Sequence, residues 1–106
     1  MSTKQDHKRW RKQFNEDCLK RDEYKCVFCE KKENLDVHHI TDRHEMPNGG
    51  YVRSNGITLC PDHHMMAEEY HMTGGELCHP GMWPKDLYLK IGSSYIQALM
   101  DSEKLL

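Results

Sequence analysis

Two pairs of potential metal ligands constrain the fold of this chain more than any other feature. Each pair has two intervening residues, and the pairs are Cys26 with Cys29 and Cys60 with His63. A tetrahedral zinc ion needs four thiolate or imidazole ligands, and this spacing lets one turn present two of them to the same ion. We therefore predict a closed structural Zn2+ site, which would join two distant parts of the chain.

The alternatives for these cysteines are ordinary buried thiols or disulfide bonds. Five cysteines would leave one unpaired in any set of disulfides. The segment 1–12 is too polar for a secretory signal, and thiolate-bound zinc suits a reducing compartment. We therefore expect zinc rather than disulfides, a cytoplasmic location and no membrane-spanning segment.

Histidines that are not needed for the zinc site crowd the same stretch. His38 and His39 are neighbours in a segment that is expected to be a strand, so their side chains should lie on opposite faces. His64 directly follows His63 and should be turned away from the zinc. One imidazole could then bind a second metal ion while another faces a substrate. The alternative is that these histidines are polar surface residues.

These residues resemble a known family. The segments 36–40 (DVHHI) and 59–64 (LCPDHH), with Asn55 between them, are similar to the HNH endonucleases, in the subgroup whose ββα-metal core is held by zinc. The likeness covers about forty residues, with Asn55 sixteen positions after His39 and nine before His64. It implies a small, treble-clef-like α+β fold and hydrolysis of phosphodiester bonds.

The resemblance also implies a role for each matching residue. His39 would be the general base that activates water, and Asn55 would fix its orientation by a hydrogen bond. His38 and His64 would hold a catalytic divalent ion, which neutralises charge at the scissile phosphate. His63 stands where the family often has a fourth zinc cysteine, so which of His63 and His64 serves which ion stays open. Imidazole ligands admit Mg2+, Mn2+ or another divalent transition metal.

A third ligand for the catalytic ion is expected on the helix that Pro61 opens. Proline suits the first position of a helix, and this helix is expected to continue to about Tyr70. His64 and Glu68 lie four residues apart and would share one helix face, so Glu68 is a candidate ligand. His71 could take its place, and a solvent-exposed helix surface is the alternative for both.

Basic residues are concentrated near the start of the chain, although the formal net charge of the whole chain is -2. Residues 1–12 contain five basic side chains and a single acidic one. Basic side chains near the site could contact the phosphates of a nucleic acid, and a solvated helix face is the alternative. The candidates are Lys8, Arg11, Arg43 and Arg53. Double-stranded DNA is the expected partner.

The remaining pattern suits one small domain of residues 1–106. Only 37% of the residues are hydrophobic and 30% are charged, so the core is small and zinc would supply missing stability. Trp10, Phe14 and Cys18 recur every four residues, which predicts an amphipathic helix whose apolar stripe packs in the core. The expected parts are an N-terminal helix at 3–21, a core at 24–72 with strands at 35–40 and 57–59, and a C-terminal helical segment at 84–105 that bends at 92–94.

Three functions are compatible with these features. The leading one is a metal-dependent DNA endonuclease or nickase. The second is a zinc-stabilised module that binds nucleic acid or protein and whose inner histidines are inert, and the third is an RNA-cleaving, toxin-like nuclease. A binding module needs only the four zinc ligands, so the additional histidines and Asn55 favour the enzyme. Small proteins of the resembled family are often encoded by phages or mobile elements. A second copy of the chain or a phage or restriction protein is therefore a candidate partner, in a bacterial or phage-infected cell.

Overall fold

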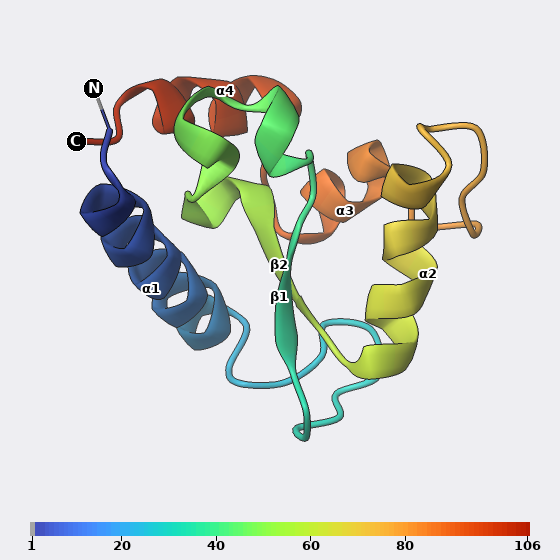
Figure 1. The fold of residues 1–106 in the computed structure, drawn as a ribbon. Helices are drawn as coiled ribbons and strands as arrows, with labels where there is room; N and C mark the ends of the chain where they lie inside the picture. Colours follow the sequence, from blue (N-terminus) through green and yellow to red (C-terminus); the bar gives the residue numbers. More distant parts are fainter. Residues whose placement is uncertain (1) are drawn as a thin grey trace.

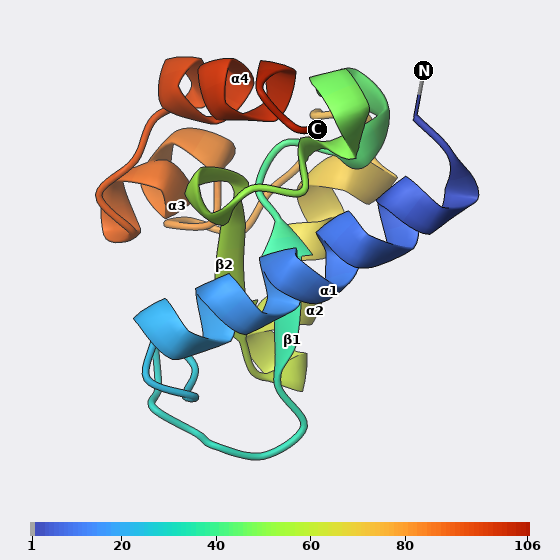
Figure 2. The same ribbon diagram turned by 90° about the vertical axis from the view of Figure 1, so that its left-hand side faces the viewer.

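A two-stranded sheet lies between the two longest helices of the protein. The computed structural model describes residues 2–106 and contains the strands β1 (Asp36–His39) and β2 (Gly56–Leu59). Helix α1 (Lys4–Arg21) covers one face of this sheet and α2 (Pro61–Met72) covers the other (Figures 1 and 2). The strands pair antiparallel, and the second edge of β1 is unpaired in this sheet. The prediction of a small α+β fold is thus confirmed.

Helix α1 begins and packs as its sequence pattern indicates. The Thr3 hydroxyl accepts a hydrogen bond from the backbone N–H of Asp6, and the Asp6 carboxylate accepts one from the Thr3 N–H. This reciprocal capping box satisfies two backbone donors that a helix start leaves free. The apolar stripe of Trp10, Phe14 and Cys18 is buried. Helix α1 is therefore fixed on the sheet by its core face.

The closest approach between α1 and the sheet is at Gly56, the first residue of β2. A Cβ atom built on Gly56 would lie 2.5 Å from the Phe14 ring and 2.6 Å from the Cys18 sulfur. The Arg21 guanidinium at the end of α1 donates hydrogen bonds to the carbonyls of Arg53 and Gly56, at 2.6 and 2.7 Å. The absence of a side chain at Gly56 therefore lets α1 lie directly on the strand.

The substitution Gly56→Ala is expected to lower the free energy of unfolding by about 1–3 kcal/mol, because the added methyl group overpacks this contact. Urea denaturation followed by circular dichroism measures the change. In a Phe14→Leu background the same substitution should lower the free energy of unfolding by less, because the smaller leucine side chain leaves space for the added methyl group. Equal unfolding midpoints for Gly56→Ala and wild type would contradict this account of the contact.

The C-terminal segment forms two helices rather than one bent helix. They are α3 (Pro84–Lys90) and α4 (Tyr95–Glu103), and Gly92 between them has a φ of 71°, which L-residues with side chains rarely adopt. Helix α4 lies against the loop that joins the strands (Figure 1), where Ser54 donates a hydrogen bond to Asp101 at 2.7 Å.

Among the described residues, no helix is both long enough and apolar enough to cross a membrane.

Candidate functional site

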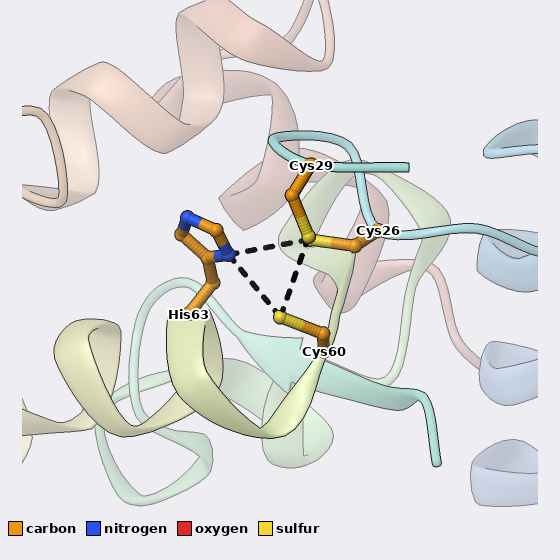
Figure 3. A group of neighbouring side chains, drawn as sticks. All are labelled: Cys26, Cys29, Cys60 and His63. Atoms are coloured by element: carbon orange, nitrogen blue, oxygen red, sulfur yellow. Dashed lines mark hydrogen bonds between the residues drawn. The ribbon is translucent and has the colours of Figure 1, made fainter. Parts of the chain in front are cut away.

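The four predicted zinc ligands lie together at the start of α2 (Figure 3). The sulfurs of Cys29 and Cys60 are 3.6 Å apart, and the Nδ1 atom of His63 lies 3.7 Å from the Cys26 sulfur and 3.2 Å from that of Cys60. Tetrahedral coordination with bonds of about 2.0–2.3 Å places ligand atoms roughly 3.3–3.8 Å apart. Three thiols and one imidazole at these distances could hold a metal ion such as zinc.

The backbone around this group explains why the side chains converge. The Cys26 carbonyl accepts a hydrogen bond from the Glu30 N–H at 2.9 Å, which closes the turn that carries the first pair. Cys60 is the N-cap residue of α2, and His63 lies in the first turn of that helix. Burial opposes the thiolate of Cys26, but backbone groups around its sulfur outweigh burial and lower the pKa of Cys26. The thiolate is the form that binds metal.

A second group of potential ligands lies on the face of β1 that α2 covers. It consists of His38, His64 and Glu68, and one ligand atom of each lies within 4.8 Å of the others. The Glu68 carboxylate is 3.0 Å from Nδ1 of His38 and 3.3 Å from Nε2 of His64. The structure thus places His63 with the cysteines and its neighbour His64 with the second group.

The protonation states of this second group suit a cation. Hydrogen bonding to His38 lowers the pKa of Glu68 to about 2, so its carboxylate is ionised at neutral pH. His38 is only 2% exposed, and burial lowers its pKa despite the nearby carboxylate. A neutral imidazole and an ionised carboxylate are both metal ligands.

His39 lies on the opposite face of β1, against α1 and the loop. Its ring stacks on Phe14 with the ring centres 4.5 Å apart, and it meets the ring of Tyr51 edge-on at 5.1 Å. Its Nε2 atom is buried and has no hydrogen-bond partner among residues 2–106. Burial lowers the pKa of His39 to about 4. His39 is therefore neutral at physiological pH, and its ring is held by aromatic contacts.

Asn55 does not hold His39 as the resemblance implied. Its buried side-chain oxygen accepts hydrogen bonds from the Thr41 N–H at 3.0 Å and from the Tyr88 hydroxyl at 2.7 Å. Its amide nitrogen donates to the carbonyls of Thr41 and Gly50, at 3.0 and 3.2 Å. An asparagine side chain has two donor hydrogens and two acceptor lone pairs, so no capacity remains for His39. Asn55 instead holds the loop that follows β1.

The aromatic contacts of His39 were missed by the interpretation of the sequence. The four-residue repeat in α1 indicated that Phe14 is buried, but the repeat carries no information about which residue it meets. Tyr51 lies in the loop between the strands, where no local pattern indicates which residues it contacts. In the structure Tyr51 is 5% exposed and lies beside both Phe14 and His39.

His71, the alternative metal ligand, has a different position. Its Nε2 atom donates a hydrogen bond to the backbone carbonyl of His39 at 2.9 Å, on the unpaired edge of β1. Its ring also stacks on that of His38, with the ring centres 5.1 Å apart. His71 lies outside the group formed by His38, His64 and Glu68. Through these two contacts His71 supports strand β1, which carries His38 and His39.

An open cavity of about 330 Å³, which we call the site cavity, reaches both faces of β1. His38, His64 and Glu68 line it from one face and His39 lines it from the other. Among the predicted phosphate-binding residues, Arg11 and Arg43 also line this cavity. Lys8 lines a neighbouring hollow, whereas Arg53 lines neither of the two.

The site cavity therefore combines three chemical capacities. The group of His38, His64 and Glu68 could hold a cation, the neutral imidazole of His39 could accept a proton, and two guanidinium groups could bind an anion. Together these groups suit a reaction in which water attacks an anionic centre. No protein-family model, curated protein or solved structure matches this chain.

Proposed function

We propose that this protein is a metal-dependent DNA endonuclease or nickase of the HNH type. One observation supports this function above the others. Consecutive histidines on opposite faces of β1 reach the same open cavity, and only His38 belongs to a potential metal-binding group. A nuclease of this kind needs a metal ligand and a free base next to one phosphate.

In this proposal, His38, His64 and Glu68 would hold a divalent ion, which would supply positive charge near the phosphoryl and leaving oxygens. Mg2+, Mn2+ or another divalent transition metal suits this ligand set. His39 takes a proton from water as the water oxygen bonds to phosphorus and the bond to the leaving oxygen breaks. The leaving oxygen then takes a proton from solvent water and becomes a hydroxyl group. The family resemblance implies products with 5'-phosphate and 3'-hydroxyl ends.

The surroundings of His39 suit this role when DNA is bound. A general base must be unprotonated before it can accept a proton. Burial keeps the imidazole of His39 in this neutral form near neutral pH. A phosphate that binds beside it favours the protonated imidazole, so the pKa of His39 should rise in the complex. Arg11 and Arg43, which line the same cavity, would bind the nonbridging phosphate oxygens.

Cleavage of supercoiled plasmid tests the proposed function. Zinc-loaded protein to which Mg2+ or Mn2+ is added should convert supercoiled plasmid to nicked or linear forms. A chelator should stop the reaction. Binding of DNA without cleavage under any of these ions would favour the alternative, an inert zinc-stabilised binding module. Cleavage of RNA but not DNA would favour the toxin-like nuclease.

The substitution Glu68→Gln is expected to raise the concentration of metal that gives half-maximal cleavage by about tenfold or more, because the ion loses its only carboxylate ligand. Titration of Mn2+ against the cleavage rate measures the change. Glu69→Gln is a matched control on the same helix, since Glu69 pairs instead with His79 at 3.2 Å. Identical titration curves for the two variants would remove Glu68 from the proposed ligand set.

A further inference from the structure

A line of basic side chains runs along α1 from its first turn to the site cavity. Lys4, Lys8 and Arg11 are spaced by four and three residues, so they share one side of the helix, and all three are exposed. Within residues 2–106, none of the three forms an ion pair with a carboxylate, whereas Arg9 on another side of α1 pairs with Asp6 at 3.3 Å. The positive charges on this line are therefore available to a partner.

The same residues connect two depressions of the surface. A hollow of about 580 Å³ lies at the start of α1. Lys4, His7 and Lys8 line it, and none of the described residues in its lining is acidic. Arg11 lines both this hollow and the site cavity. The two depressions therefore adjoin at Arg11, and a chain of phosphates could pass from one to the other.

The charge around α2, on the other side of the site cavity, is opposite. Asp36 at the start of β1 is exposed and lies 3.5 Å from His64, and Glu68 lines the cavity on that side. The first turn of α2 carries a further exposed carboxylate, Asp62, but this one pairs with Lys31 at 3.5 Å. A polyanion that left the cavity on this side would pass the Asp36 carboxylate, which forms no ion pair with a lysine or arginine of the described residues.

From this asymmetry we propose that one nucleic acid strand leaves the site cavity along α1, with its phosphates bound first by Arg11 and then by Lys8 and Lys4. The position of the scissile phosphate rests on the proposed nuclease function, but the binding surface does not depend on cleavage. The helix rises about 10 Å from Lys4 to Arg11, which matches roughly three nucleotides of one strand. The partner is thus a nucleic acid held by its backbone, without contacts that read the bases.

Salt-dependent binding of a short labelled DNA duplex tests this path. Fluorescence anisotropy without a catalytic ion gives the slope of log affinity against log salt concentration, which counts the phosphates that the protein contacts. Lys4→Ala and Lys8→Ala should each make the slope shallower by about one, and the double variant by about two. Lys20→Ala is the matched control, because Lys20 is an exposed lysine of α1 that lines neither depression. Its slope should equal that of the wild type.

Three results would overturn the path. The first is a wild type that does not bind DNA, and the second is a double variant that binds with the wild-type slope. The third is a Lys20→Ala variant whose slope falls as much as that of Lys4→Ala, which would show diffuse attraction instead of a path. The cleavage assay separates this proposal from the nuclease function. DNA binding that depends on Lys4 and Lys8, without cleavage, would refute only the nuclease function. Cleavage with DNA binding that is unchanged in the Lys4→Ala and Lys8→Ala variants would refute only the path.

Discussion

Replacement of His39 by alanine is expected to lower the rate of plasmid cleavage by about 100- to 10,000-fold, the usual contribution of a positioned general base. The loss should appear in kcat at saturating metal, because the potential ligands of the ion, His38, His64 and Glu68, are unchanged. Gel analysis of single-turnover cleavage gives the rate. The Mn2+ concentration for half-maximal activity should stay near that of the wild type.

His44→Ala is the matched control for this prediction. His44 is exposed, lies five residues further along the chain and does not line the site cavity. Its replacement should leave cleavage unchanged. Removal of the His39 ring also leaves space beside Phe14, so the zinc content and melting temperature of His39→Ala must be compared with those of wild type. A folded His39→Ala variant that cleaves at the wild-type rate would disprove the role of His39 as base.

Cys26→Ala is expected to prevent the binding of zinc by the predicted group of three cysteines and His63, and to remove most of the stability of the protein. Binding of structural zinc provides roughly 10–16 kcal/mol in small zinc domains, as much as the whole net stability of a typical domain. Loss of only about 3 kcal/mol would lower the melting temperature of a domain of this size by roughly 15 °C. Elemental analysis of the purified protein gives the zinc content, and thermal melts followed by circular dichroism give the stability.

Cys78→Ala is the control, because Cys78 is a partly buried cysteine outside both groups of potential ligands. It should retain one zinc per chain and melt near the wild-type temperature. A wild-type protein without zinc, or a Cys26→Ala variant that keeps it, would contradict the structural site. Since His63 and His64 are adjacent in α2, loss of zinc should also weaken binding of the ion that we propose at His38, His64 and Glu68.

The parts of the fold that depend on short sequence patterns could be predicted from the sequence. Helix α1 lies where the repeat of Trp10, Phe14 and Cys18 placed a helix, and its start is fixed by the local capping box. The group of three cysteines and one histidine could also be predicted, because only two residues separate the members of each pair. Alternation along a strand likewise separated His38 from His39.

The contacts that depend on packing between distant segments could not be predicted. The family resemblance implies that Asn55 holds His39, but the partners of Asn55 include Tyr88. This residue lies thirty-three positions later, on a helix whose position no local pattern specifies. The partnership of Phe14 with His39 depends in the same way on how α1 crosses the sheet. Charge and loop position make Arg53 a candidate for phosphate contact, but it does not line the site cavity.

The hydrogen bond from Tyr88 to Asn55 makes helix α3 part of the unit that surrounds the site cavity rather than an appendage. Asn55 fastens the loop segment that begins at Thr41, two residues after His39 and two before Arg43. A truncation or fusion that displaced α3 would leave the buried Asn55 oxygen short of a donor and loosen that loop. The shortest fragment able to keep the site in order must therefore extend through Tyr88, well beyond the segment that contains all the potential metal ligands.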